Sequence, residues 1–308
     1  MNFLIAGPGA MGCLFAARLK KAGHEVTLLD YRPERASKIN EQGIRVEGVT
    51  GEYNIHVHVT TEDIMEYPDL VLVCVKAHQT QKAAEKIKAL LGQEIRVLTL
   101  QNGVGNVEIL SEVFGTEKVL GGTTAEGATL LDPGHIRHAG QGDTIIGPEG
   151  KSNGPVARIV SAFTSAGFNS RSVKNVNDLI WGKLIINVGI NALTAITRLK
   201  NGRLAEINGT KAVMEKAVQE AVAVANAKNI DLPYPDPQER VREVCRATAG
   251  NIASMLQDVL QKRITEVGFI NGAIVREGEA LGIHTPVNYT LTCLVETIQE
   301  TYQESLYS

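Results

Sequence analysis

Short apolar runs alternate with helical spacings along the first part of the chain, and helical spacing alone continues in the last part. Asp69–Val75 and Ile95–Leu100 are nearly continuous apolar runs, as expected for parallel strands that are covered on both faces. Beyond Lys174 the apolar residues recur three or four positions apart, which is the pattern of helices. The sequence therefore predicts an α/β domain over residues 1–173 and an all-α domain over residues 174–308.

Each domain can be divided further by its turn and cap residues. In the first domain we predict strands at Asn2–Ala6, Val26–Leu29, Asp69–Val75, Ile95–Leu100, Val119–Thr124, His135–Ala139, Thr144–Gly147 and Phe168–Val173, a hairpin over Ile44–Val59, and helices at Leu14–Ala22, Gln79–Leu91, Asn106–Phe114 and Pro155–Ala166. In the second domain we predict helices at Asn175–Gly202, Gly209–Asn229, Gln238–Lys262, Thr265–Leu281 and Val287–Gln303.

The stretch from Asn175 to Gly202 is apolar on almost every side, and a helix of this kind belongs in the interior of a structure. Lys183, Asn187 and Asn191 nevertheless recur at steps of four, so they stack along one face. If neighbouring helices satisfy these polar groups, the row is a structural seam. The lysine favours a ligand-facing stripe instead, because buried lysines are rare and their pKa shifts readily.

A glycine-rich motif directly follows the first predicted strand. Its residues are Gly7, Pro8, Gly9, Ala10, Met11 and Gly12. A helix and a second strand come next, and Asp30 closes that strand 18 residues after Gly12. This order is typical of Rossmann-type domains, in which the glycines let the backbone approach a pyrophosphate and the helix N-terminus supplies N–H donors. We therefore predict a dinucleotide site; a glycine turn without a ligand is the alternative.

Two further polar residues follow predicted parallel strands. Lys76 ends the strand Asp69–Val75, and Asn102 follows the strand Ile95–Leu100. Ligands of open parallel sheets bind beyond the carboxyl ends of the strands, so both residues are candidates for contact with a cofactor or substrate. The alternatives are a solvated helix-entry residue for Lys76 and a plain turn for Asn102-Gly103.

The charge balance argues against a nucleic-acid or membrane-surface role. The 308 residues include 31 basic and 34 acidic ones, which gives a net charge of −3 without a block of like charge. Purely apolar runs such as Leu70–Val75 are far too short to span a bilayer. We expect no signal peptide, because the first strand begins without a basic leader.

The cysteines and histidines do not form a metal-binding pattern. The four cysteines, which lie far apart and include no Cys-x-x-Cys pair, are Cys13, Cys74, Cys245 and Cys293. They are typical of reduced thiols in the core of a cytoplasmic protein. His56 and His58 are predicted to share one face of a surface strand, and no third ligand is near them in the sequence, so we predict no metal site.

Several short motifs, in order along nearly the whole chain, resemble the ketopantoate reductases (2-dehydropantoate 2-reductases). The matching segments are Gly7–Gly12, Lys76-Ala77, Asn102-Gly103, Trp181-Gly182-Lys183, Asn187, Asn191–Ala195, Asn201-Gly202, Asn251–Asp258, Thr265-Glu266 and Ile270-Asn271-Gly272. So many matches at fitting separations are far more specific than a glycine motif alone. The resemblance implies reduction of ketopantoate to pantoate with NADPH, a step toward pantothenate and coenzyme A.

The resemblance also implies roles for individual residues. It makes Lys183 and Glu266 the catalytic pair, both also in contact with the substrate, and the other substrate-binding positions are Asn102, Asn187, Asn191, Asn201 and Ser254. The chemistry agrees, because hydride delivery to a ketone builds negative charge on its oxygen, which an ammonium can stabilise and protonate. Ser254 and Asp258, one turn apart, also fit an ordinary helix surface, and we favour that interpretation for Asp258.

The residues after the second strand differ from the family pattern. NADPH-dependent members tend to carry a basic residue there, whereas this chain has Asp30-Tyr31-Arg32. A carboxylate at a strand end favours a ribose hydroxyl and repels a 2′-phosphate, although Arg32 or Arg35 could reach a phosphate. The family implies NADP(H), and Asp30 leaves NAD(H) open.

Two other functions stay compatible with the sequence. The first is a reductase of the same architecture that acts on another small 2-keto or hydroxy acid, because fold does not decide the substrate. The second is a dinucleotide-binding regulator without turnover, against which the presence of Lys183 and Glu266 argues. A helical second domain is compatible with a homodimer.

Overall fold

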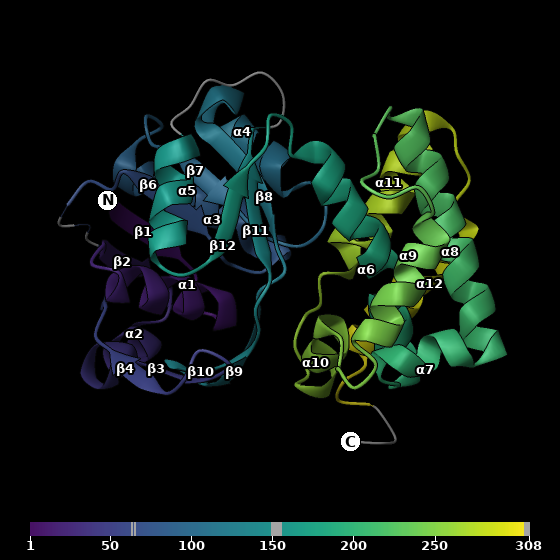
Figure 1. Cartoon of the computed structure of the whole chain (residues 1–308), viewed down its shortest axis with the longest axis horizontal. Helices are drawn as coiled ribbons and strands as arrows, with labels where there is room; N and C mark the ends of the chain where they lie inside the picture. The colour runs from purple at the N-terminus through teal and green to yellow at the C-terminus, as the bar shows by residue number, and fades with distance from the viewer. Residues whose placement is uncertain (63, 65, 149–155, 305–308) are drawn as a thin grey trace. The chain divides into compact units, whose positions relative to one another are not determined.

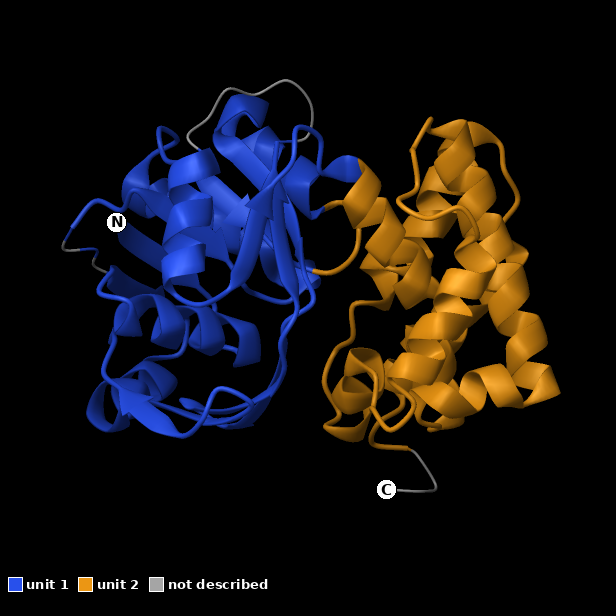
Figure 2. Cartoon of the chain, viewed as in Figure 1, with its two compact units in different colours: residues 1–101, 106–177 blue, residues 102–105, 178–308 orange. Residues whose placement is uncertain are grey.

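The chain folds into two compact units, described here from a computed structural model that covers residues 1–62, 64, 66–148 and 156–304. The first unit comprises residues 1–101 and 106–177, and the second comprises residues 102–105 and 178–308 (Figure 2). The sequence placed the division near Lys174 and did not anticipate that Asn102–Gly105 would belong with the second unit.

The first unit is built on an eight-stranded sheet (Figure 1). In spatial order its strands are β12 (Asn169–Ser172), β11 (Asp143–Gly147), β8 (Val119–Thr124), β7 (Val97–Thr99), β6 (Leu70–Val73), β1 (Asn2–Ala6), β2 (Glu25–Leu29) and β5 (His58–Thr60). Neighbouring strands are parallel except β8 and β11, which are antiparallel. The central strands β6 and β7 are buried at every residue, as their continuous apolar sequences predict.

A smaller four-stranded sheet completes the first unit together with its helices. Its strands, in spatial order, are β4 (Tyr53–Ile55), β3 (Ile44–Gly48), β10 (His135–Gly140) and β9 (Gly127–Asp132). The helices are α1 (Ala10–Lys21), α2 (Pro33–Gln42), η1 (Ala77–Gln79), α3 (Thr80–Leu91), α4 (Asn106–Phe114), η2 (Thr116–Lys118) and α5 (Val156–Ser165). Pro155, where the sequence placed the start of α5, lies outside the described residues.

One prediction for this unit is wrong, and two of its elements, α2 and β9, were not predicted. The hairpin expected over Ile44–Val59 ends at Ile55, because β5 leaves it and pairs with β2 in the large sheet. His56 therefore lies outside a strand, although it and His58 are both exposed. The strand β9 was not predicted at all, since its first four residues are half-buried and it shows no apolar–polar alternation.

Helices are the only regular elements among the described residues of the second unit. Its helices are α6 (Asn177–Thr197), α7 (Asn201–Glu206), α8 (Asn208–Ala227), α9 (Pro237–Ala247), α10 (Ser254–Leu260), η3 (Val267–Phe269), α11 (Asn271–Leu281) and α12 (Pro286–Glu300). A Rossmann-type α/β domain followed by an all-α domain is thus confirmed.

Three helices predicted as single pieces are interrupted. The helix from Asn175 stops at Thr197, because Arg198 has a left-handed φ of 56°. The helix expected over Gln238–Lys262 breaks between α9 and α10, where the carbonyls of Ala249 and Asn251 accept the first N–H groups of α7. Helix N-termini leave such donors without an intrahelical partner, so a contact between distant segments explains this break. The third break separates η3 from α11.

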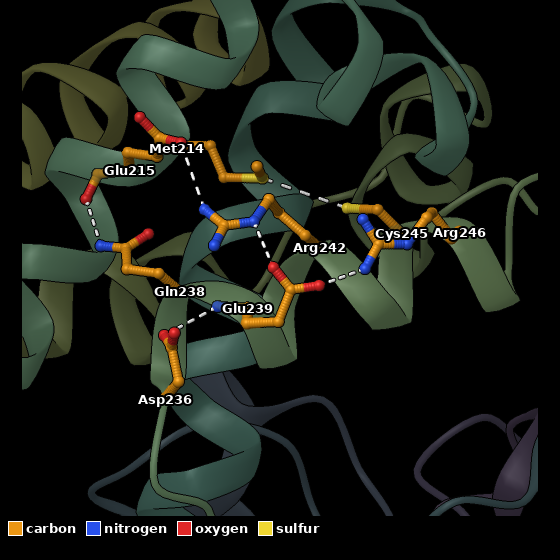
Figure 3. A network of polar contacts seen from close by, with 8 residues as sticks. All are labelled: Met214, Glu215, Asp236, Gln238, Glu239, Arg242, Cys245 and Arg246. Atoms are coloured by element: carbon orange, nitrogen blue, oxygen red, sulfur yellow. Dashed lines mark hydrogen bonds and ion pairs between the residues drawn. The ribbon is translucent and has the colours of Figure 1, made fainter.

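Helix α9 is fixed on α8 by polar contacts (Figure 3). The Asp236 carboxylate caps α9 by accepting the backbone N–H of Glu239 at 2.9 Å. Arg242 donates to Glu239 at 2.8 Å and to Glu215 of α8 at 3.2 Å. The Gln238 side chain donates to the Glu215 carbonyl oxygen at 2.7 Å. These bonds hold the start of α9 against α8.

Helix α6 forms the core of the second unit, as its all-round apolar sequence predicts. Trp181, Leu184, Ile185 and Val188 are each at most 1% exposed. By length and composition alone α6 is the one described helix that could cross a membrane, but 67% of its most apolar stretch is buried inside the protein. That burial is typical of a core helix in a soluble protein.

Candidate functional site

The glycine motif connects β1 to α1 by a turn that requires its glycines. Gly7 has a φ of 104°, where a side chain would be strained. A Cβ on Gly12 would lie 2.0 Å from the Gly7 carbonyl oxygen, so α1 can approach the turn only without a side chain there. Gly9, the N-cap of α1, has open space where its Cβ would be. Backbone N–H groups at the start of α1 are thus accessible to an anionic group, as a pyrophosphate requires.

The turn lies where the order of the sheet reverses. The strand β1 has β2 on one side and β6 on the other, so successive connections leave in opposite directions beside it. Ligands of such sheets bind at this position. Lys76 follows β6 there as the N-cap of η1 and is half-buried. The first unit therefore brings together the predicted cofactor residues Gly7–Gly12 and Lys76 at the carboxyl ends of the neighbouring strands β1 and β6.

Asp30 lies at the carboxyl end of β2, but its carboxylate is already engaged. It accepts the backbone N–H groups of Tyr31 at 2.6 Å and Arg32 at 3.2 Å. Arg35 donates to both carboxylate oxygens at 2.5 Å, and the Asp30 side chain is fully buried. Burial alone would lower the pKa of the Arg35 guanidinium, but these hydrogen bonds hold that pKa above its usual value. The carboxylate that the sequence offers to a ribose is thus part of an ion pair with Arg35.

A polar network behind the strand ends was missed by the sequence analysis. Gln101 donates to the Val75 carbonyl oxygen at 2.7 Å and to the Thr80 hydroxyl at 2.9 Å. Thr80 in turn donates to Asn106 at 2.8 Å. The network fixes the ends of β6 and β7 relative to each other, just before Asn102. Its only sequence signal was the polar residue Gln101 at the end of an apolar strand.

The segment Asn102–Gly105 leaves the first unit and packs with the second. The backbone N–H of Val104 donates to the Phe269 carbonyl oxygen at 3.0 Å. A Cβ on Gly103, which has a φ of 87°, would lie 2.3 Å from that same oxygen. The half-buried Asn102 is therefore placed, within the second unit, next to the segment that carries Glu266.

Lys183 and Glu266 form the charged part of the second unit's candidate site. Lys183 is half-buried on α6, and Glu266, the N-cap of η3, is 8% exposed. Burial lowers the pKa of Lys183 from 10.5 to about 8, although the charge of Glu266 acts to raise it. A lysine with this pKa exchanges its proton near neutral pH, which suits a general acid.

The polar row on α6 continues from Lys183 to the half-buried Asn187 and the buried Asn191. Asn201, the first residue of α7, is 7% exposed and donates from its side chain to the Thr248 hydroxyl at 2.9 Å. Its oxygen Oδ1 is buried without a hydrogen-bond partner. A buried acceptor of this kind costs free energy, so it is a suitable position for a ligand hydroxyl to donate to.

The start of α10 places its two polar residues differently from expectation. Ser254 is the first residue of α10 and is exposed, whereas Asp258, one turn later, is 5% exposed. The prediction that Asp258 lies on a helix surface is therefore wrong. The polarity of Asp258 gave no indication that its face of α10 points inward. Among the described residues, no group of three or more His, Cys, Asp or Glu side chains could hold a metal ion.

Comparison with known proteins finds matches to both parts of the chain. The family description "Ketopantoate reductase PanE/ApbA" matches residues 3–150, and its C-terminal counterpart matches residues 175–299. The 2-dehydropantoate 2-reductase of Halobacterium salinarum is 37% identical over 306 residues, covering 97% of this chain and 99% of that protein.

Solved structures show the same similarity. The ketopantoate reductase of Ralstonia eutropha is 36% identical with a TM-score of 0.90, and the match covers 98% of this chain and 100% of that one. A D-mandelate dehydrogenase solved with NADH and anilino(oxo)acetate is 28% identical with a TM-score of 0.92 over the same shares of the two chains. The chain therefore belongs to the ketopantoate reductase family.

Proposed function

We propose that Lys183 and Glu266 catalyse the reduction of 2-dehydropantoate to pantoate in this enzyme, an oxidoreductase of pantothenate biosynthesis that acts on a CH–OH group. The observation that carries the proposal is the half-buried Lys183, whose pKa is lowered to about 8 in the vicinity of the buried Glu266.

A nicotinamide dinucleotide, when bound, would supply the hydride for the C2 carbonyl carbon. Lys183, as an ammonium, stabilises the negative charge that develops on the carbonyl oxygen and transfers a proton to it. Glu266 keeps the ammonium form populated by raising the pKa of Lys183. Because the charge on the oxygen appears only during the reaction, this interaction lowers the barrier without tightening substrate binding.

The remaining polar residues of the second unit suit a substrate that carries a hydroxyl and a carboxylate. We assign substrate binding to Asn102, Asn187, Asn191, Asn201 and Ser254, together with the catalytic pair. Asn201 supports this assignment best, because its buried oxygen Oδ1 lacks a donor and the 4-hydroxyl of 2-dehydropantoate is a donor of the required kind.

For the cofactor we propose NADPH. The charge of Asp30 is compensated by Arg35 and its oxygens are engaged, so the carboxylate is not presented to a ribose. Arg32 is exposed at the N-cap of α2, where its guanidinium lies 5.1 Å from the centre of the Tyr31 ring. We assign the 2′-phosphate to Arg32, the pyrophosphate to the turn from Gly7 to Gly12, and a supporting contact to Lys76. We also place the enzyme in the cytoplasm.

The substrate is tested by steady-state kinetics, followed as the absorbance loss of the reduced cofactor. We compare 2-dehydropantoate with phenylglyoxylate, the keto acid that corresponds to mandelate, because a D-mandelate dehydrogenase shares this fold. A kcat/KM that is at least about tenfold higher for 2-dehydropantoate supports the assignment. A preference for phenylglyoxylate would replace the proposed substrate with an aromatic 2-keto acid.

The catalytic role of Lys183 is tested by Lys183→Ala. Its kcat should fall by about 10²–10⁴-fold, the usual contribution of a general acid, while cofactor affinity stays unchanged. Lys216→Ala, at an exposed lysine of α8, is the matched control and should leave kcat unaltered. In the wild type, kcat/KM should decline as the pH rises through about 8, because the ammonium form is lost there. Near wild-type turnover in Lys183→Ala would refute the role.

A further inference from the structure

Three side chains form a buried hydrogen-bonded relay that ends on the catalytic helix. Asn271, the first residue of α11, donates from Nδ2 to the Val188 carbonyl oxygen of α6 at 3.3 Å and to Asn288 Oδ1 at 2.9 Å. Asn288 of α12 donates to Glu220 at 2.7 Å and to the Ala217 carbonyl oxygen at 3.0 Å. Asn271 and Asn288 are both 0% exposed. The relay thus joins α8, α12, α11 and α6 (Figure 1).

The acceptors at the two ends of the relay fix the direction in which its hydrogen bonds are donated. Glu220 also accepts the backbone N–H groups of Val287 and Asn288, each at 2.9 Å, and so caps the start of α12. Because a carboxylate and a carbonyl only accept, Asn288 must donate to Glu220, and Asn271 must donate to Val188. Neither amide can rotate by 180° without placing an oxygen against another oxygen.

Asn271 is retained at a cost to stability. Its oxygen Oδ1 is buried without a hydrogen-bond partner, and a buried unpaired acceptor is destabilising. A leucine of similar size would fill the same space without a polar atom. The residue therefore contributes something other than packing, and its two donated bonds specify a position for α11 relative to α6.

The relay lies between the segments that carry the catalytic pair. Asn271 is five residues beyond Glu266, and Val188 is five residues beyond Lys183 on α6. The intervening segment is held from its other side as well, since Phe269 accepts the backbone N–H of Val104 at 3.0 Å. Arg276 donates to the Gly268 carbonyl oxygen at 2.6 Å. The bond from Asn271 to Val188 is the one among these that reaches the helix of Lys183.

We propose that Asn271 is a positioning residue that sets the separation of Glu266 and Lys183 through its bond to the Val188 carbonyl, with Asn288 and Glu220 holding its amide in the donating orientation. The proposal rests on the catalytic roles assigned above. Without the bond, the start of α11 and the preceding segment shift relative to α6, and Glu266 moves away from Lys183. Glu266 is the charged group that acts on Lys183 in the structure, so the ammonium form then becomes less favourable.

The test compares Asn271→Leu with the wild type and with Val224→Ala, a control that truncates a fully buried residue of the same core outside the relay. In Asn271→Leu, kcat should fall by about tenfold while the KM for 2-dehydropantoate changes by less than about twofold. The pH above which kcat/KM declines should move downward by about 0.5, because a more distant Glu266 no longer raises the pKa of Lys183. Val224→Ala should lower the melting temperature without moving that pH.

Glu220→Gln weakens the hydrogen bond from Asn288 and should lower kcat and shift the pH profile in the same directions, by smaller amounts. This variant provides the test if Asn271→Leu does not fold. An unchanged pH profile with an unchanged kcat in the folded variant overturns the proposal. If Asn271→Leu shows no change while Lys183→Ala is inactive, the proposed role of the relay is rejected and the catalytic roles of Lys183 and Glu266 are retained. Full turnover in Lys183→Ala rejects the catalytic pair and the relay together.

Discussion

The carboxylate of Asp30 shows how its neighbours decide what a single side chain can bind. At a strand end of a dinucleotide-binding domain, an acidic residue is the usual acceptor for ribose hydroxyls. Here Arg35 and two backbone N–H groups occupy both of its oxygens. Asp30 therefore supports the cationic residues around it, and for this reason we propose the exposed Arg32 for the contact with the cofactor.

The prediction at this scale concerns cofactor preference. Arg32→Ala should lower kcat/KM for NADPH by about tenfold or more and leave NADH within about twofold, because a charge-assisted bond to the 2′-phosphate is lost. Arg32→Lys should keep part of the preference, since a point charge replaces a bidentate donor. The measurement is the ratio of kcat/KM for the two cofactors. A wild type that prefers NADH would contradict the proposal.

Individual residues were predictable in their position but less so in their partners. The sequence placed Asp30 at the end of its strand, yet the pairing with Arg35 depends on the direction in which α2 leaves that strand. Asp258 was expected on a surface and is buried on the inward face of α10. Local pattern identifies such groups, whereas tertiary packing decides whether they meet ligand, protein or water.

At the scale of elements, the glycine turn gives a matched pair of variants. Gly9→Ala should leave the melting temperature within about 2 °C, because its Cβ meets open space, but it should weaken NADPH binding at least about tenfold by intruding on the pyrophosphate. Gly12→Ala should weaken binding and also stability, because its Cβ would collide with the Gly7 carbonyl oxygen. Thermal unfolding and cofactor titration of both variants give the answer. Unaltered binding in Gly9→Ala would place the pyrophosphate elsewhere.

Most elements followed from hydrophobic periodicity, and two of the helix breaks involve bonds to distant segments. The breaks after Thr197 and after α9 occur where backbone groups of one segment bond to a distant segment, such as Asn201 N–H with the Asn251 carbonyl oxygen. The strand β9 was missed for a different reason, because it lacks apolar–polar alternation and pairs with the neighbouring strand β10. Periodicity reports which face of an element is buried, and it contains no information on bonds to remote backbone.

At the scale of the whole molecule, two residues close in sequence support different cores. Leu98 is fully buried in the core of the first unit, and Val104 is 6% exposed in the core of the second. Val104→Ala shortens the buried side chain by two carbon atoms and should destabilise the second unit by about 2 kcal/mol. Leu98→Ala should destabilise the first unit by about 2–5 kcal/mol.

Hydrogen exchange resolved by segment distinguishes these two effects. Amides of α6 and α11 should lose protection in Val104→Ala, and amides of β1 and β6 should lose it in Leu98→Ala. Equal loss in both units from either variant would show that the chain unfolds as one cooperative body and would contradict the assignment of Val104 to a separate core.

The four residues Asn102–Gly105 have a consequence for how such a protein can diversify. Recombination between related genes often joins the front half of one to the back half of another. A crossover near Asn177 would give the helical unit a foreign version of this segment, although Gly103 must pass within contact of the Phe269 backbone. We expect hybrids to be viable only when both parents share this fit.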